Sequence, residues 1–259
     1  MRDQLKVATW LVLGLVGCGD NVSPEPPDPV EPTPQPPADT PPLPRLAGAH
    51  TFDTTAGTLD GSPVPFGTFS DGQWKLPDGL EVAEDVTLSV SGSEPFSLDA
   101  TGQPLHVFGV IQFDGTAGVT GGTTRLAGET IVVSGSFHAN GGAGDDSHGG
   151  SGGVFELDAT SISVTGAFHC DGGVGGAGFP GGSGGVVDFE ARSISVTGTI
   201  GCSGGDGGDG SFASPTGGDG GDGGVVTLTS GTVENTATIR TNGGAGGADD
   251  QLRAEGEPQ

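Results

Sequence analysis

Six aspartates in the second half of this chain lie in glycine-rich segments, a setting that favours cation binding. They are Asp145, Asp146, Asp206, Asp209, Asp219 and Asp222. Hard cations such as Ca²⁺ take carboxylate and carbonyl oxygens as ligands, so these residues are candidate calcium ligands. The segment Gly217 to Val225 nearly fits the calcium repeat Gly-Gly-x-Gly-x-Asp-x-apolar-x, except that Gly224 occupies the apolar position. The segments are not in tandem, which leaves two interpretations: a weak calcium site or a solvated acidic edge.

The remaining charged residues give no pattern typical of catalysis. Parallel β-helix enzymes that act on polysaccharides need carboxylates with Arg or Lys in one groove. Lys75, Arg125, Arg192 and Arg240 are scattered along the chain, apart from any acidic cluster. The sequence also has no nucleophile motif and no phosphate-binding loop before a helix. We therefore expect no catalytic residues and no cofactor other than calcium, with a polysaccharide lyase or hydrolase as the alternative.

One sequence pattern positions most of these residues, because it recurs four times at nearly fixed spacing. Its copies begin at Ile131, Ile162, Ile194 and Val233 and align without gaps, at spacings of 31, 32 and 39 residues. Each copy alternates apolar and polar residues, as a β-strand does, and is followed by Gly-Gly. An earlier copy begins at Leu105, and a further strand precedes each of the later copies. A fixed period of this size indicates a repeat architecture.

The repeat predicts an all-β fold with no significant helix, specifically a parallel β-helix (β-solenoid) of about five to six coils. Each coil would contain a strand, a corner, a strand, a glycine bend, a short strand and a glycine-rich loop. The alternation predicts three inward columns, which begin at Ile131, Val133 and Phe137. All glycine-rich loops should leave the coils at one edge. Their period of three residues suits packed polyproline-II-like strands, and disordered loops are the alternative.

Cys170 and Cys202 occupy the same position in adjacent copies of the repeat. Stacking in register would place their Cα atoms about 4.8 Å apart, within the range that a disulfide needs. An oxidising compartment would favour the bond. Two reduced cysteines packed as small apolar side chains remain the alternative. His138 and His169 stack in the same way on the outward side, where a pair of exposed polar residues is the simpler interpretation than a zinc site.

The first 18 residues have the features of an export signal. Arg2 and Lys6 precede an apolar run from Val7 to Val16, which is too short for a stable membrane span. The run ends in Leu15-Val16-Gly17-Cys18, which resembles the lipobox of bacterial lipoproteins. That resemblance implies cleavage before Cys18 and acylation of Cys18. The acidic residue that favours inner-membrane retention in that family is absent at Gly19, so an outer-membrane location is implied.

Composition divides the rest of the chain into four parts. Residues 19–48 contain a run of prolines that predicts a stiff, disordered tether. Residues 49–92 concentrate aromatic side chains and predict an N-terminal cap with the first strands. Residues 93–247 form the coils of the solenoid, and residues 248–259 form a flexible tail.

Charge limits the partners that this protein can have. The chain has 33 acidic and 8 basic residues and a formal charge of −25. This balance opposes binding to nucleic acids, and it opposes an electrostatic grip on anionic lipid. The remaining partners are a membrane reached through a lipid anchor, a glycan or another surface protein.

Together, the lipobox, the proline-rich tether and the coils that end in Gly-Gly resemble glycine-rich parallel β-helix surface lipoproteins of bacteria. The resemblance implies an exported, acidic, adhesin-like protein that is anchored to the outer membrane and faces the periplasm or the cell surface. We expect a structural or adhesive role. A polysaccharide-active enzyme and a calcium-dependent binding module are the alternatives.

Overall fold

The computed structural model describes residues 42–211 and 215–249. Cys18, the export signal and most of the predicted tether lie outside these ranges. The described residues form an all-β structure of eighteen strands without a helix. Accordingly, no helix in the described ranges is long and apolar enough to cross a membrane.

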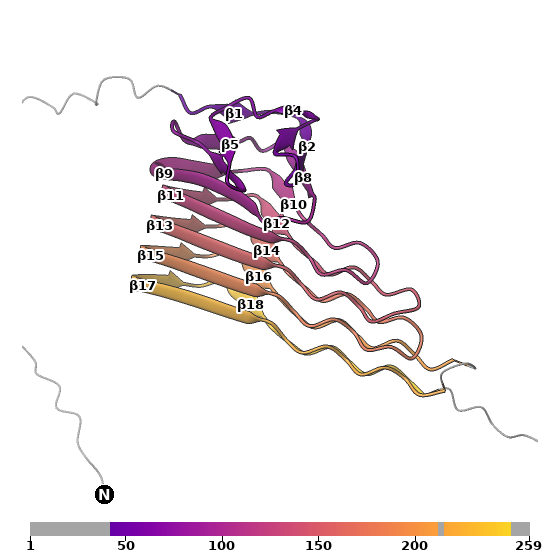
Figure 1. Ribbon diagram of the computed structural model, residues 1–259. Coiled ribbons are helices and arrows are strands. Elements are labelled where there is room, and N and C mark those ends of the chain that lie inside the picture. Colours follow the sequence, from indigo (N-terminus) through magenta and orange to yellow (C-terminus); the bar gives the residue numbers. More distant parts are fainter. Residues whose placement is uncertain (1–41, 212–214, 250–259) are drawn as a thin grey trace, which may run out of the picture. The chain divides into compact units, whose positions relative to one another are not determined.

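Two largely parallel sheets run along the body of the molecule (Figure 1). The first, here called the long-strand sheet, is built on β9 (Phe96–Val107), β11 (Thr123–Val133), β13 (Val154–Val164), β15 (Val186–Val196) and β17 (Val225–Asn235). The second, the short-strand sheet, contains β10 (Val110–Gln112), β12 (Ser136–His138), β14 (Ala167–His169), β16 (Thr199–Gly201) and β18 (Thr238–Arg240). Each repeat contributes one strand to each sheet.

The strands of the copies that begin at Ile131, Ile162 and Ile194 pair in one register, which confirms the predicted inward columns there. The pairing of β9 with β11 shifts in register between Gly128 and Thr130. Ile131 pairs with Ile162, which pairs with Ile194, and Phe137 pairs with Phe168. All five side chains are buried. The rings of Phe137 and Phe168 stack with their centroids 4.9 Å apart. The unequal spacing of the copies therefore falls outside the strands.

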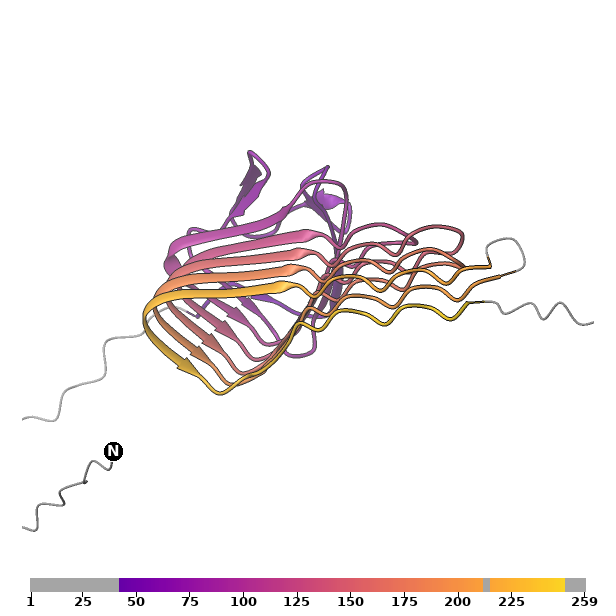
Figure 2. The ribbon, with the colours of Figure 1, turned by 90° about the horizontal axis from the view of Figure 1, so that it is seen from below.

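The predicted corner in each repeat is present, but it is a bend within one continuous strand and does not separate two strands. In β13, Phe155 and Leu157 are buried, and so are Ile162 and Val164. The buried residues have odd numbers in the first pair and even numbers in the second, so the side of the strand that points inward changes between them. The backbone pairing with the neighbouring strands continues through this bend. Figure 2 shows this bend in each long strand.

Antiparallel hairpins change the pattern at the N-terminal end of the body. The strands here are β1 (Arg45–Leu46), β2 (Ala49–Asp53), β3 (Thr58–Leu59), β4 (Ser62–Pro63), β5 (Thr68–Ser70), β6 (Gln73–Lys75), β7 (Leu80–Val82) and β8 (Thr87–Ser91). Strand β2 pairs antiparallel with β3, and β5 with β6. The ring of Phe52 lies 5.5 Å from that of Trp74 and 5.1 Å from that of Phe96. Because β1 pairs with β7, the tether predicted for residues 19–48 is wrong for its last residues.

The glycine-rich segments form paired extended arms that leave the body on one side, as predicted (Figures 1 and 2). We call them the glycine arms, and they comprise residues 113–122, 139–153, 170–185, 202–224 without 212–214, and 241–249. Outgoing arms of successive repeats bond through every third amide, and Gly172, Gly175 and Gly178 donate to the carbonyls of Ser203, Asp206 and Asp209. This three-residue period is that of polyproline II. Of the two predicted alternatives, the packed form is therefore the observed one.

Return arms form a second layer against the outgoing arms. Gly182 N donates to Gly173 O, and Gly205 N donates to Gly182 O, both at 2.8 Å. A Cβ on Gly172 of an outgoing arm would lie 2.0 Å from Gly182 O of the return arm, so no side chain fits between the layers. A Cβ on Gly182 would lie 1.9 Å from Gly150 O of the neighbouring return arm. Ala248 and Asp249 belong to the last arm, because Gly210 N donates to Ala248 O. The tail predicted for residues 248–259 is thus wrong for its first two residues, and the others lie outside the described ranges.

Candidate functional site

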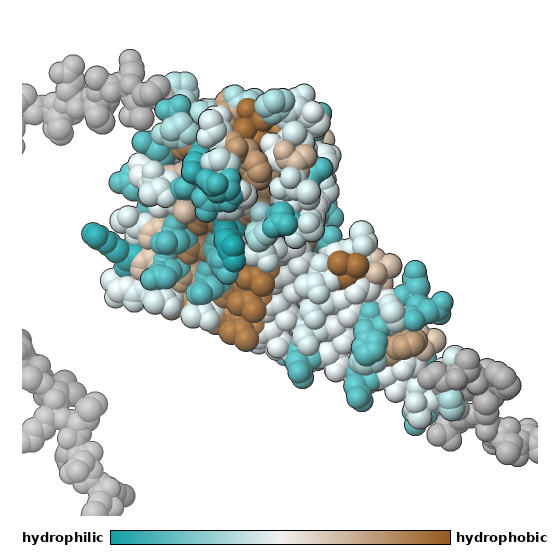
Figure 3. Space-filling model, in the orientation of Figure 1, coloured by the Kyte–Doolittle hydropathy of each residue, from teal (hydrophilic) through white to brown (hydrophobic). Residues whose placement is uncertain are grey.

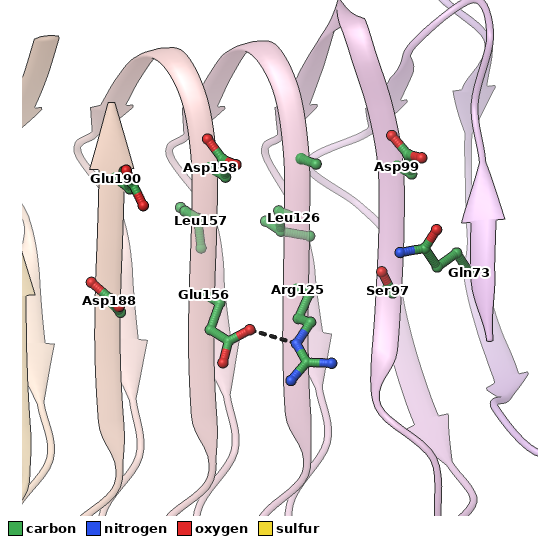
Figure 4. A pocket seen from close by; sticks show the side chains of 11 residues that line it. Gln73, Ser97, Asp99, Arg125, Leu126, Glu156, Leu157, Asp158, Asp188 and Glu190 are labelled. Carbon is green, nitrogen blue, oxygen red and sulfur yellow. Dashed lines mark hydrogen bonds and ion pairs between the residues drawn. The ribbon is translucent and has the colours of Figure 1, made fainter. Parts of the chain in front are cut away.

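Acidic side chains gather on the outer face of the long-strand sheet, where Figure 3 shows hydrophilic residues. Register places Asp158 beside Glu190 in one outward column, and Glu156 beside Asp188 in the next. Arg125 forms an ion pair with Glu156, so the prediction that the basic residues lie apart from any acidic cluster is wrong for Arg125. These residues, with Asp99 and others, line a shallow hollow of about 290 Å³ (Figure 4). The face can attract cations, since one guanidinium faces five carboxylates.

The aspartates predicted as calcium ligands lie on the glycine arms, where they are spread over two repeats. Asp206 Oδ1 accepts a hydrogen bond from Ala245 N at 2.7 Å, and Asp209 Oδ1 accepts one from Ala248 N at 2.8 Å. The carbonyls of Asp219 and Asp222 accept from Gly181 and Gly184 on the return side. Two of the carboxylates therefore hold the next arm in place.

Asp145 and Asp146 lie on the arm that precedes Ser147 and His148, apart from the other four aspartates in sequence. In the described part of the chain, no three His, Cys, Asp or Glu side chains come together as a group that could hold a metal ion. Calcium binding stays a prediction.

A ladder of side-chain hydrogen bonds at the base of the arms was missed by sequence reasoning. Asp114 Oδ1 accepts from Asn140 N at 2.7 Å, and Asn140 Oδ1 accepts from Asp171 N at 3.0 Å. Asp171 Oδ1 in turn accepts from Ser203 N at 2.6 Å. The available signal was a short polar residue directly before Gly-Gly in successive copies. The side chains of Asp114, Asn140 and Asp171 each tie their own repeat to the next one.

Cys170 and Cys202 form a disulfide across adjacent repeats, with their Cα atoms 4.5 Å apart. Both residues are fully buried. Ala139 occupies the same buried column one repeat earlier. The bond therefore links the bases of two arms inside the body, away from any surface that a substrate could reach.

The outer face of the short-strand sheet carries a second polar column. Register aligns Gln112, His138, His169, Gly201 and Arg240. The His138 and His169 rings stack, with centroids 4.9 Å apart and an interplanar angle of 23°. Burial lowers the pKa of His138, and His169 lowers it further, while Asp114 opposes the shift.

A hollow of about 400 Å³ lies in this column at the position where Gly201 has no side chain. We call it the Gly201 hollow, and its lining includes His169, Asp171, Thr199, Ser203, Asp206 and Arg240. The column therefore carries a side chain on four of its five strands, and it has a gap at Gly201.

Comparison of the chain with protein-family models, with curated proteins and with solved structures gave no match.

Proposed function

We propose that this chain is an exported lipoprotein that displays a glycine-rich parallel β-helix at the cell surface, where it has a structural or adhesive role. In this proposal Cys18 carries the lipid, and the proline-rich segment holds the folded part away from the outer membrane. The folded part is a β-solenoid of about five to six coils with an N-terminal cap. It resembles the glycine-rich surface lipoproteins of bacteria.

The observation that carries the proposal is the two-layered array of glycine arms. Its interior consists of backbone bonded to backbone, as between Gly182 and Gly173, and side chains project only at intervals of about three residues. Such an array is an extended, pre-organised surface, and rigidity lowers the entropic cost of contact with a partner. An array of this kind suits display and adhesion better than it suits catalysis.

Two further features support the architecture in the proposal. The four long strands β11, β13, β15 and β17 keep one register over successive repeats, as stacked coils require. Hairpins with buried Trp74 and Phe52 lie at the N-terminal end, where a solenoid needs a cover for its core and its first strand edge.

The test is expression of the full chain and of a Cys18→Ala variant in a Gram-negative host. We expect the unaltered chain in the outer-membrane fraction with acyl chains on Cys18, and the variant in the soluble exported fraction. Cells that display the unaltered chain should adhere to immobilised glycans or matrix proteins more strongly than cells with the variant. Equal fractionation of the two chains would contradict the anchor. Release of reducing ends from a bound glycan would assign the enzymatic alternative instead.

A further inference from the structure

Gly201 is a glycine that its own backbone does not require. Its φ lies outside the left-handed region, in contrast to glycines such as Gly178. A Cβ at Gly201 would meet no atom closer than His169 Nδ1 at 3.6 Å, which is an ordinary contact. At Gly198, three residues earlier, a Cβ would lie 1.8 Å from Gly166 O. A glycine within a strand weakens the strand, and it often marks a place where a ligand approaches the backbone closely.

Two planar side chains border the gap that Gly201 leaves in its column. One face of the His169 ring stacks on His138, so its other face is turned toward position 201. Arg240 follows on the other side of the gap. Its side chain is exposed, and it forms no ion pair with any residue in the described ranges. An unpaired guanidinium is notable in a chain with a formal charge of −25.

The spacing of the strands sets the size of the gap. Strands β14 and β18 are separated by β16 alone, so the backbones that carry His169 and Arg240 lie two strand spacings apart, about 9.6 Å. A ring placed between the imidazole and the guanidinium would also contact the Asp171 carboxylate, since both its oxygens lie 3.7 Å from a Cβ built at position 201. A longer or branched group would have to project outward from the sheet.

Hydrogen-bonding groups of both kinds surround the gap. Asp171 and Asp206 each accept a backbone amide hydrogen bond at Oδ1, which leaves Oδ2 of each carboxylate without a hydrogen-bond partner among the described residues. Thr199 and Ser203 add hydroxyls, and Arg240 adds donors. The carboxylates accept from ligand hydroxyls in charge-assisted hydrogen bonds.

We propose that the Gly201 hollow binds one neutral pyranose unit of a glycan, stacked on His169, with its hydroxyls donating to Asp171 and Asp206 and accepting from Arg240. This inference deepens the proposed adhesive function by assigning it a ligand class and a site. A uronic acid fits less well, because its carboxylate would meet two aspartates. An aromatic side chain of a protein also fits less well, because a phenyl ring leaves the carboxylates without donors.

The test measures binding of neutral hexose oligosaccharides and of uronic-acid oligosaccharides to the full chain by ligand-observed NMR. Gly201→Gln fills the hollow with the side chain that Gln112 already presents in the same column. Thr229→Gln, at an exposed strand position of the long-strand sheet, is the matched control. We expect at least ten-fold weaker neutral-hexose binding for Gly201→Gln, weaker binding for Arg240→Gln, and unchanged binding for Thr229→Gln. The melting temperature should stay the same in all three variants.

The outcomes separate this inference from the proposed function. Neutral hexose that binds Gly201→Gln as well as it binds the unaltered chain would overturn the site. Preference for uronic acids, or for aromatic peptides added as competitors, would overturn the ligand class. Cells that adhere through the protein while no neutral hexose binds would overturn the inference and leave the adhesive role intact. If Gly201→Gln fails to fold, Arg240→Gln decides the question, since its side chain is exposed.

Discussion

Polar side chains in this molecule mostly bind its own backbone. Asp53 Oδ1 accepts from the amides of Thr55 and Ala56, and Asp60 Oδ1 accepts from Thr51 N. The ladder at the base of the arms follows the same rule between repeats. An aspartate in this sequence can therefore hold a neighbouring segment in place by accepting a hydrogen bond from its backbone amide. Such an amide needs an acceptor when it has no partner in a sheet.

One residue pair makes the stability of the N-terminal hairpins depend on pH. His50 Nδ1 donates to Asp60 Oδ2 at 2.7 Å. The hydrogen bond with Asp60 raises the pKa of His50 above 6.5, and the hydrogen bond with His50 lowers the pKa of Asp60 below 3.8. The contribution of His50 is complete below pH 6.5 and is lost as the pH rises through the raised value. The contribution of Asp60 is complete above pH 3.8 and is lost as the pH falls through the lowered value.

We therefore expect His50→Gln to lower the melting temperature most between pH 3.8 and pH 6.5, and progressively less toward pH 9. A double-mutant cycle with Asp60→Asn isolates the pair, and Asn tolerates the positive φ of 51° at this position. Thermal unfolding followed by circular dichroism at each pH measures the coupling. A coupling that does not change between pH 5 and pH 9 would rule out the ion pair as its source.

The elements of this fold differ in how well the sequence predicts them. Alternation predicted the inward columns because burial of one face leaves only one register for each strand. It did not predict that β13 is one bent strand, because Asp158 to Ser161 give the same pattern whether the backbone turns or stops. The arms were ambiguous because Gly-Gly-x describes a flexible chain and a packed one equally well. Only the structure decides between them, through contacts so close that a Cβ on Gly182 would lie 1.9 Å from Gly150 O.

The two-layer packing of the arms predicts that one methyl group disrupts it. In Gly182→Ala the new Cβ would lie 1.9 Å from Gly150 O, so the return arms that contain Gly150 and Gly182 must move apart. The hydrogen bond from Gly182 N to Gly173 O and the one from Gly205 N to Gly182 O should weaken, at about 1 kcal/mol each. Amide exchange at Gly182 and Gly205 should accelerate roughly ten-fold, while amides of the long-strand sheet keep their protection.

Ser183→Ala is the matched control, because Ser183 is the next residue of the same arm and already has a Cβ. Its exchange rates should match those of the unaltered chain. Fast exchange at Gly182 and Gly205 in the unaltered chain itself would mean that the arms do not pack in solution.

The two ends of the whole molecule are finished differently. At the N-terminal end, hairpins bury Phe52 and Trp74. At the other end, β17 and β18 pair with β15 and β16 on one edge, and no described strand pairs with their other edge. Val225, Val233 and Ile239 are 55%, 45% and 39% exposed there. Figure 3 shows an apolar patch at this lower end of the body. Stability should therefore decrease along the stack toward β17.

Val187 and Val226 measure this gradient, because they are register partners in β15 and β17 with the same side chain. Val187 is fully buried, whereas Val226 is half-buried. We expect Val187→Ala to lower the free energy of unfolding by about 2 kcal/mol and Val226→Ala to lower it by roughly half as much or less. Urea titration followed by circular dichroism gives both values. Equal losses would show that another surface covers this end in solution.

The glycine arms differ in length from repeat to repeat, although the strands that carry them keep their register. Asn140 and Ser151 occupy the outgoing and return positions that Ser203 and Asp222 occupy two repeats later. The first pair is separated by ten residues and the second by eighteen. The strands on either side remain aligned, so all the added length goes into the overhang. One extra Gly-Gly-x triplet on each side would extend an overhang by about 9 Å and leave both sheets unchanged. Insertions and deletions within the arms are thus a mutational route by which such a protein changes its reach without refolding its body.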